Sequence, residues 1–312
     1  MLSLAIVILC FAIINTCIVL LLRKFKIINE DKLVIDLENS IFVCIVSYKD
    51  PKWIESVISI LNTAYERNRV FIGVVEYVDN KSMIDIVPQN IRNQIRIKTL
   101  SYKSATTLCE ARKLCMNTLF YNEKYVLFTR AINLYESWDI ILTSYIKNRN
   151  TVISTLLIND PINIFTTITS INKNNISIGY KELFSTSDEP IKSIVWCPDL
   201  YFCLSSIYIH TLHDETSLGV SAYLYHKKIK IYNPGQCIGT KGKHPRGIRQ
   251  KNTCLLKYDL IKSYCEYLGI NIENQNISPY LKCGLNKNAK ADECISKYGS
   301  VSQANIIVEN SG

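Results

Sequence analysis

The stretch Ile41-Phe-Val-Cys-Ile-Val-Ser47 is a strand-like apolar run, and Tyr48-Lys-Asp-Pro51 interrupts it. A second apolar run follows at 70–76 and a third at 125–128, with segments of helical spacing between them. Strands that alternate with helices predict a parallel sheet with helices on its faces. Ligands of such sheets bind beyond the carboxyl ends of the strands. The segments that we expect to line one crevice there are 47–50, 76–79 and 129–133.

The composition is that of a folded domain with a basic excess. Of 312 residues, 48% are apolar and 20% are charged, and the formal net charge is +9. This suits one large α/β domain, with or without a small appendage. The basic excess favours phosphate, a sulfated glycan or an anionic surface as partner. No aromatic-interleaved platform for nucleic acid and no Ser/His/Asp set is evident, so we expect no nucleic-acid partner.

Residues 2–22 contain no charged side chain and are almost wholly apolar, which is long enough to cross a bilayer. We predict a retained transmembrane anchor, because no charged region precedes the run and no small-x-small site follows it. A cleaved signal peptide is the alternative. The basic cluster at 23–26 favours a cytosolic domain, whereas a Golgi or ER enzyme requires the opposite orientation. The side of the membrane stays open, and a Golgi or ER membrane or a viral envelope is the expected location.

The chain is predicted to have four parts. They are an anchor at 2–22, a juxtamembrane spacer at 23–39, an α/β domain at 40–240 and a basic, cysteine-bearing, loop-rich extension at 241–312. Helices of the domain are predicted at 51–66, 106–121, 138–146 and 214–226. Its later strands are predicted at 151–157, 194–205 and 229–232. The asparagine-rich segment 163–186 is predicted to be a long surface excursion.

The chain has 12 cysteines and no CxxC pair, so zinc-type spacing is absent. Cys44 lies inside a predicted strand, where a buried thiol is expected. For the C-terminal cysteines, disulfides in an oxidising compartment and buried free thiols are equally good interpretations. These residues are Cys237, Cys254, Cys265, Cys283 and Cys294.

Several segments in order resemble the GlcNAc-transferase-type glycosyltransferases that include the enzyme modifying hydroxyproline on a ubiquitin-ligase subunit. Ile41 to Asp50 is similar to the first strand of that family and its S-Y-R/K-D turn. Thr107-Leu-Cys-Glu-Ala-Arg112 resembles its G-P-x-x-A-R segment without the glycine and proline. Tyr125 to Asp139 resembles Y-x-x-x-D-S-H-x-x-F-x-x-x-W-D. His213-Asp-Glu215 and Tyr232-Asn-Pro234 fit the later acidic helix start and strand end.

The resemblance implies a nucleotide-sugar-binding α/β fold of the type called GT-A. It also implies transfer of a hexosamine from a UDP-sugar with Mn²⁺ or Mg²⁺. The metal-binding D-x-H/D motif of the family falls here on Thr129 and Ala131, with Arg130 between them. Neither residue can replace a carboxylate or imidazole as a ligand, so we expect no metal site and no metal cofactor. Lys241 lies near the place of a family histidine close to the phosphates.

Two interpretations follow. In one, Arg130 and Lys241 neutralise the diphosphate directly, and the chain is an active, metal-independent hexosaminyltransferase. In the other, the fold is retained without the chemistry, and the basic crevice binds an anionic glycan or a protein partner. The hypothesis that we favour is a membrane-anchored, glycosyltransferase-like protein with weak or no catalysis.

Five further side chains are candidates for nucleotide-sugar binding. Asp50 is placed to contact uridine, although an aspartate before a proline also forms turns. Glu76 has a nucleotide contact and a structural role as equal alternatives. Arg112 is a candidate phosphate clamp, or an arginine on a solvated helix face. Ser47 and Thr129 complete the set.

Glu215, with Asp214 beside it, is the candidate acceptor-side base. A carboxylate at a helix start is also favoured by the helix dipole alone. Trp138 and Asp139 are expected to pack and to cap a helix. The segment from Lys241 to Lys251 is the densest basic run, with five formal positive charges, and is either a binding site for anions or a solvated loop.

Overall fold

The computed structural model describes part of the chain. The described residues are 39–79, 82–105, 107–172, 175–183, 188–207, 216–241 and 258–270. The predicted anchor at 2–22, the candidate bases Asp214 and Glu215, and the basic run after Lys241 lie outside them. Within the described ranges, each helix is too short or too polar to span a bilayer. The anchor and the domain boundaries therefore remain predictions.

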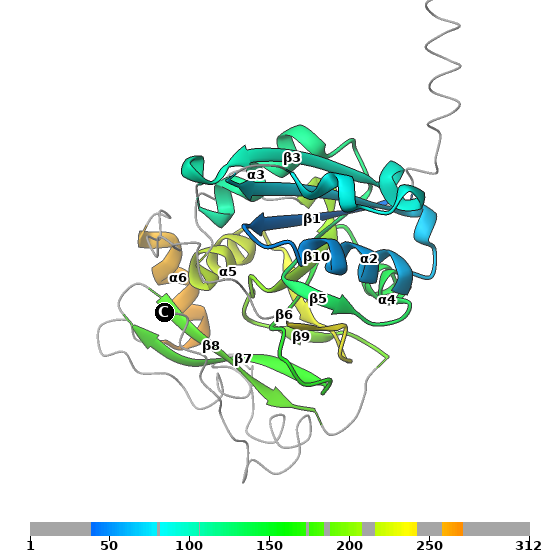
Figure 1. Cartoon of the computed structure of the whole chain (residues 1–312). Helices are drawn as coiled ribbons and strands as arrows, with labels where there is room; N and C mark the ends of the chain where they lie inside the picture. Colours follow the sequence, from blue (N-terminus) through cyan, green and yellow to red (C-terminus); the bar gives the residue numbers. More distant parts are fainter. Residues whose placement is uncertain are drawn as a thin grey trace, which may run out of the picture. The chain divides into compact units, whose positions relative to one another are not determined.

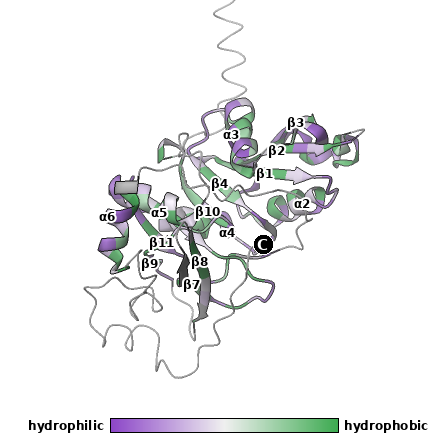
Figure 2. Ribbon diagram, turned by 90° about the vertical axis from the view of Figure 1, so that its left-hand side faces the viewer, coloured by the Kyte–Doolittle hydropathy of each residue, from purple (hydrophilic) through white to green (hydrophobic). Residues whose placement is uncertain are grey.

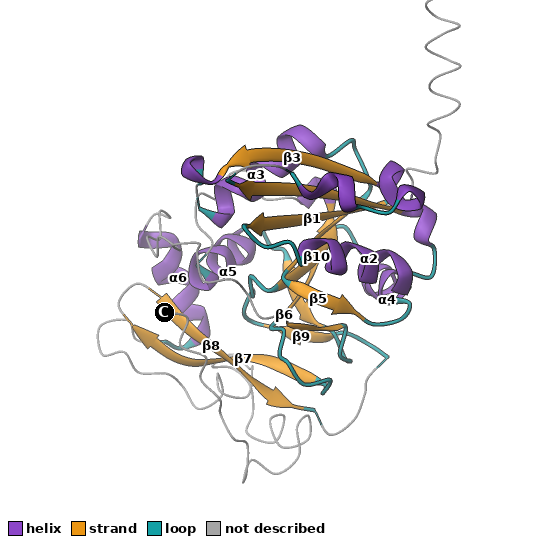
Figure 3. Cartoon of the chain, viewed as in Figure 1, coloured by secondary structure: helices purple, strands orange, loops and turns teal. Residues whose placement is uncertain are grey.

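A mixed, mainly parallel sheet forms the centre of the domain (Figures 1 and 3). Strands β9 and β10 run antiparallel to the other strands. In spatial order the strands are β3 (Ile95–Ser101), β2 (Val70–Val78), β1 (Ile41–Tyr48), β4 (Tyr125–Thr129), β10 (Leu200–Leu204), β6 (Thr151–Thr155), β11 (Lys230–Asn233) and β9 (Ile191–Ser193). The predicted mainly parallel sheet is confirmed.

Strand β1 is buried on both faces, because successive side chains of a strand point to opposite sides. Ile41, Val43 and Ile45 belong to one apolar cluster, and Phe42 and Cys44 belong to another. The first cluster includes helices α2 (Trp53–Thr63) and α4 (Trp138–Tyr145), and the second includes α3 (Leu108–Leu119) and α5 (Ser217–His226). Each face of the sheet is thus covered by two helices, and hydrophobic residues line the strands between them (Figure 2).

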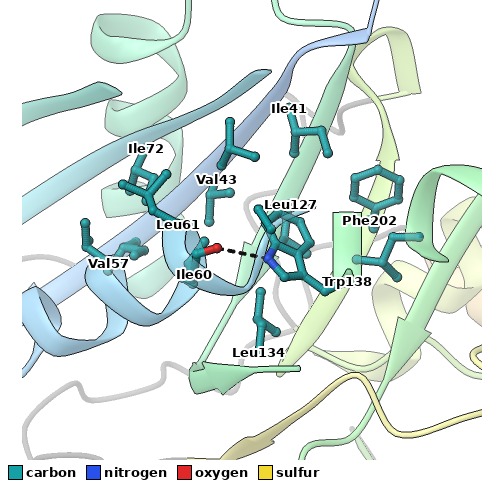
Figure 4. Close-up of a cluster of buried hydrophobic side chains, with 14 of the residues drawn as sticks. Ile41, Val43, Val57, Ile60, Leu61, Ile72, Leu127, Leu134, Trp138 and Phe202 are labelled. Atoms are coloured by element: carbon teal, nitrogen blue, oxygen red, sulfur yellow. Dashed lines mark hydrogen bonds between the residues drawn. The ribbon is translucent and has the colours of Figure 1, made fainter. Parts of the chain in front are cut away.

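Trp138 is fully buried at the centre of the first cluster (Figure 4). Its Nε1–H donates a 3.0 Å hydrogen bond to the carbonyl oxygen of Ile60 in α2. The expected packing of Trp138 is confirmed. Asp139 does not cap its own helix, because its carboxylate accepts hydrogen bonds from the amides of Tyr65 and Glu66 at the end of α2. These two residues of α4 therefore hold α2 in place.

Two predictions for the second half of the chain are wrong. The expected excursion at 163–186 contains a hairpin of β7 (Ile164–Asn172) and β8 (Asn175–Glu182), in which Phe165, Ile168 and Ile176 are buried. The expected strand at 194–205 is shorter, because Trp196-Cys-Pro-Asp199 forms a loop before β10. The extension beyond Lys241, predicted to be loop-rich, includes helix α6 (Tyr258–Leu268), which packs against α5.

The described cysteines are free thiols. They are Cys44, Cys109, Cys115, Cys197, Cys203, Cys237 and Cys265. The expected buried thiol at Cys44 is confirmed. Among the C-terminal cysteines, the thiol interpretation holds for Cys237 and Cys265, whereas Cys254, Cys283 and Cys294 lie outside the described residues.

Gly73→Ala should destabilise the fold. Gly73 lies in β2 opposite Cys44, and a Cβ there would come within 2.3 Å of Phe42 Cζ and 2.9 Å of Cys115 Sγ. Overpacking of this kind costs about 1–3 kcal/mol. Chemical denaturation of the 39–312 fragment should show this loss, and Gly73→Ala combined with Cys115→Ala should recover part of it. An unchanged midpoint for Gly73→Ala would contradict the packing.

Candidate functional site

The strand order reverses between β1 and β4. From β1 the chain proceeds outward through β2 and β3, and β4 then pairs with the other side of β1. In parallel α/β sheets, ligands bind at the carboxyl ends of the strands where the order reverses. Ser47 and Glu76 are paired neighbours at this edge, and Thr129 ends the adjacent β4. The structure therefore brings the three segments expected from the sequence to one edge of the sheet.

Arg130 and Lys241 lie on either side of one buried carboxylate, that of Asp199. Arg130 Nη1 is 3.4 Å from Asp199 Oδ1, and Lys241 Nζ is 3.8 Å from Asp199 Oδ2. The amide of Leu157 also donates to Oδ2, at 3.3 Å. The Asp199 side chain is 4% exposed, whereas those of Arg130 and Lys241 are 23% and 21% exposed. The two cations thus reach solvent in front of an enclosed carboxylate.

Backbone pairing places these three side chains. Thr129 pairs with Leu200 in the antiparallel β4–β10 ladder, and the next amide, that of Arg130, donates to the carbonyl of Asp199 at 2.7 Å. Lys241 belongs to β12 (Gly239–Lys241), which pairs with β5 (Ala131–Leu134) directly after Arg130. The amide of Lys241 also donates to the carbonyl of Ile158. Three chain segments therefore converge on Asp199.

Asp199 was not among the candidates predicted from the sequence. It lay inside the predicted strand 194–205, so its carboxylate was not expected at the sheet edge. The sequence did contain an indication, because Pro198 cannot donate to a central ladder and proline-aspartate pairs favour turns. A strand that starts after Pro198 places Asp199 at its entrance, on the same edge as the end of β4.

Arg112 is buried, so it lies neither on a solvated helix face nor where its guanidinium is open to a phosphate. It is 5% exposed, and its Nη2 donates to the carbonyl of Pro198 at 3.1 Å. Its guanidinium lies 5.4 Å from the Phe128 ring centroid and 5.8 Å from that of Tyr201. Arg112 therefore fixes the loop that presents Asp199, from the α3 side of the sheet.

Glu76 has a structural role. Its side chain is fully buried and accepts hydrogen bonds from four donors. They are Trp53 Nε1 (3.1 Å), Met83 N (3.1 Å), Ser82 Oγ (2.7 Å) and Thr99 Oγ1 (3.4 Å). The carboxylate thereby ties α2, β3 and the turn after β2 together, and its oxygens are directed into the protein rather than toward a ligand.

Ser47 and Asp50 form the turn between β1 and α2. Ser47 Oγ–H donates to the carbonyl of Asp50 at 2.9 Å, and Asp50 Oδ1 accepts from the amide of Lys52 at 3.0 Å. Both side chains therefore support the turn-forming alternative. They nevertheless shape the backbone at the carboxyl end of β1, beside β4.

An aromatic group, Tyr48, Tyr77 and Tyr102, stands at the ends of β1, β2 and β3. The ring of Tyr48 lies 5.4 Å from Tyr77 and 5.1 Å from Tyr102, and Lys49 Nζ is 3.4 Å from the Tyr102 centroid. Burial, followed by Tyr102 and Tyr77, raises the pKa of Tyr48, while Lys49 lowers it. Tyr48 therefore remains a neutral phenol with a hydroxyl hydrogen to donate. Sequence reasoning missed this group, because the three tyrosines come from separate segments: Tyr48 from β1, Tyr77 from β2 and Tyr102 from the turn after β3.

The arrangement around Asp199 does not fit a divalent ion. A single carboxylate with two cations beside it offers a metal neither the charge nor the ligand number that Mg²⁺ or Mn²⁺ needs. Among the residues that the structure describes, no three His, Cys, Asp or Glu side chains are grouped to hold a metal. Cys197 offers no nucleophile either, because burial and then Asp199 raise the pKa of its thiol well above the ordinary value.

No protein-family model and no curated protein sequence matches the chain. Among the solved structures that are similar to it, all those described next have low sequence identity. TarS 1–349 of S. aureus in complex with UDP-GlcNAc is 11% identical with a TM-score of 0.43, over 78% of this chain and 69% of that fragment. In another structure of that TarS fragment, the chain covers only 60% of the fragment.

The mannosyltransferase PcManGT from Pyrobaculum calidifontis, in complex with GDP-Man and Mn²⁺, is 10% identical with a TM-score of 0.43, over 67% of this chain and 58% of that one. A 4-diphosphocytidyl-2C-methyl-D-erythritol synthase from Anaerococcus prevotii is 11% identical with a TM-score of 0.39. The similarity covers 75% of this chain and 98% of the synthase chain. Similarities at this level assign no role to any residue of this chain.

Glu76→Gln should lower stability without removing ligand affinity. The amide NH₂ of glutamine would face at least one of the four donors that now bind the carboxylate, which costs about 1–3 kcal/mol. Glu55→Gln, at an exposed position of α2, is the matched control and should leave the unfolding free energy unchanged. A loss of nucleotide affinity in a stably folded Glu76→Gln protein would instead assign Glu76 to the site.

Proposed function

We propose that this chain is a glycosyltransferase-like protein that binds the diphosphate of a nucleotide sugar between Arg130 and Lys241 without a divalent ion. The observation that supports it is the convergence of these two cations at the point where the strand order reverses. Arg130 directly follows β4 and Lys241 ends β12, and the pairing of β5 with β12 brings the two residues together. A cationic pair at this edge is suited to an anion.

The two cations have complementary chemistry. The planar guanidinium of Arg130 presents paired N–H donors that match phosphate oxygens, and the ammonium of Lys241 acts as a compact point charge. Metal ions in sugar transfer neutralise the diphosphate, and fixed cations at the same place can do so electrostatically. Both side chains are partly exposed, so a ligand can reach them.

The aromatic group supplies a surface for the base. Nucleobases stack on tyrosine rings irrespective of sequence. By the β1–β4 register Thr129 is level with Ile45, so Tyr48 lies three residues further along, roughly 10 Å in strand rise. A nucleoside placed at Tyr48 and Tyr102 can extend its phosphates toward Arg130, which is the order of groups in a UDP-sugar.

The proposal includes weak or no catalysis. Thr129 and Ala131 stand where the resembled family has its metal ligands, so the leaving diphosphate would depend on Arg130 and Lys241 alone. Asp214 and Glu215, the candidate bases, directly precede Thr216, the N-cap of α5. If the chain is active, the reaction is transfer of a hexosamine from a UDP-sugar to a protein or glycan hydroxyl.

The wider setting is also part of the proposal. Residues 2–22 would anchor the domain in a lipid bilayer, at a Golgi or ER membrane or a viral envelope. The alternative function is that of a non-catalytic binding protein, whose basic edge takes an anionic glycan or a protein partner instead of a nucleotide sugar.

Calorimetric titration tests the proposal. The soluble domain should bind UDP-GlcNAc, or another UDP-hexosamine, equally well with manganese and with EDTA. Arg130→Ala and Lys241→Ala should each weaken binding by about tenfold or more, because a hydrogen bond to a charged group contributes about 1.5–3 kcal/mol. Release of UDP in the same samples measures any transfer or hydrolysis.

Lys230→Ala is the matched control, because Lys230 is an exposed lysine on β11. It should leave affinity unchanged. Absence of binding by every UDP-sugar would rule out the nucleotide-sugar function, and binding that requires manganese would rule out the metal-independent site.

A further inference from the structure

We infer that the edge of the sheet opposite the candidate site docks on the anionic headgroups of a lipid bilayer. The side chains that form this surface lie just before the parallel strands, so we call it the amino-end surface. Its members are the cations Lys124, Arg149, Lys227 and Lys228 and the tyrosines Tyr65, Tyr121 and Tyr225. The inference goes beyond the proposed function and does not rest on nucleotide-sugar binding.

Strand pairing places the four cations in one row. Strands β4, β10, β6 and β11 are neighbours in that order. Lys124 directly precedes β4, Arg149 lies just before β6, and residues 227–228 lie just before β11. The amide of Ser205, after β10, donates to the carbonyl of Lys124 at 2.8 Å. Adjacent strands are about 4.8 Å apart, so the row from β4 to β11 extends over roughly 15 Å.

The four cations of this row are exposed, and their charges are not neutralised by ion pairs. Among the residues that the structure describes, no carboxylate lies within ion-pair distance of any of them. Glu123, beside Lys124 in the chain, is buried and pairs with Arg96 instead. Four like charges along one edge attract an extended anionic surface.

Exposed tyrosines gather at the same edge. Tyr65 lies shortly before β2, Tyr121 before β4 and Tyr225 before β11, and they are 74%, 58% and 37% exposed. Tyr121 and Tyr225 are close to the two ends of the row of cations. Tyrosine is enriched where a bilayer meets water, because its ring contacts the apolar region while its hydroxyl stays hydrated. The combination of rings and cations therefore suits a lipid surface.

The chain enters the domain at this edge as well. The carbonyl of Ser40, just before β1, accepts from the amide of Tyr125 at 3.0 Å, next to Lys124. The predicted anchor at 2–22 precedes this point, so anchoring would raise the effective concentration of lipid at the amino-end surface. The basic cluster at 23–26 favours the cytosolic leaflet, which is the anionic one. Charge, exposed rings and chain entry thus favour the same occupant.

Docking by this edge leaves the candidate site open. Lys124 precedes β4 and Arg130 follows it, so the rise of the strand separates them by roughly 20 Å. A bilayer on the amino-end surface therefore lies at the far edge of the sheet from Arg130 and Lys241, and the nucleotide-sugar site would face water.

Vesicle flotation tests the surface with mixed phosphatidylcholine and phosphatidylserine as the probe. The fragment 39–312 contains all four apolar clusters of the described residues, so it keeps the core. It should bind these vesicles at low salt and leave them at high salt, because salt screens the exposed charges. Vesicles of phosphatidylcholine alone should not bind it.

Neutralising the row should weaken vesicle binding by about 100-fold or more, since each cation near an anionic bilayer contributes about fivefold. The variant carries Lys124→Gln, Arg149→Gln, Lys227→Gln and Lys228→Gln. The matched control removes the same charge from exposed lysines elsewhere and should bind nearly as tightly as the wild type. It carries Lys52→Gln, Lys98→Gln, Lys103→Gln and Lys192→Gln.

Quenching by brominated lipid tests the contact in the full chain, reconstituted in nanodiscs that contain phosphatidylserine. Tyr121→Trp should lose tryptophan emission, whereas Tyr102→Trp, at the carboxyl edge of the sheet, should keep it. The native tryptophans Trp53, Trp138 and Trp196 are buried and give the same background in both variants. Neutralising the row should remove the quenching at position 121.

The outcomes separate this inference from the proposed function. Unchanged vesicle binding by the neutralised variant, or equal quenching at the two positions, would overturn the inference. Retention on heparin or RNA without binding to vesicles would also overturn it and assign the surface to another polyanion. The neutralised variant should keep the UDP-sugar affinity of the wild type. If vesicles dock but no UDP-sugar binds, the amino-end surface stands and the proposed function fails.

Discussion

The carboxylate of Asp199 is the point on which the candidate site depends. It lies at the start of β10, where the amide of Arg130 at the end of β4 binds its carbonyl and the amide of Leu157 after β6 binds its side chain. Strand β12 then places Lys241 against the same carboxylate. Because backbone groups hold Asp199, two cations from distant parts of the chain acquire a fixed position at the sheet edge.

The hydrogen-bond and ion-pair partners of three buried carboxylates separate those with a structural role from the one at the candidate binding site. Glu76 is enclosed by four neutral donors, and Asp139 by two amides and Arg69 Nη2 at 2.8–3.2 Å. Both have their hydrogen-bonding capacity used by the fold. Asp199 has one amide and two longer contacts to partly exposed cations. All three carboxylates are buried, so burial does not separate them. The contact distances and the exposure of the partner side chains do.

The hydrophobic periodicity of the sequence was sufficient to predict the strands and helices in the first half of the fold. Apolar runs predicted β1, β2 and β4, and helical spacing predicted α2, α3 and α4, because local burial patterns decide those elements. It failed for the β7–β8 hairpin, whose polar composition suggested a surface excursion, and for Asp199, which fell inside the predicted strand 194–205. It also left a ligand contact and a structural role as equal alternatives for Glu76, since a strand-end position does not reveal which donors surround a carboxylate.

By itself, the sequence determined an alternating α/β domain, the absence of a carboxylate at Thr129 and the presence of Arg130 at the end of β4. Those features depend on residues near one another in the chain. The tertiary structure alone decided that Lys241 lies beside Arg130, that Asp199 lies between them, and that Tyr48 and Tyr102 share an edge. The reason is physical: pairing between strands that are far apart in the sequence sets which side chains meet, and the pattern within one segment does not reveal its partner strand.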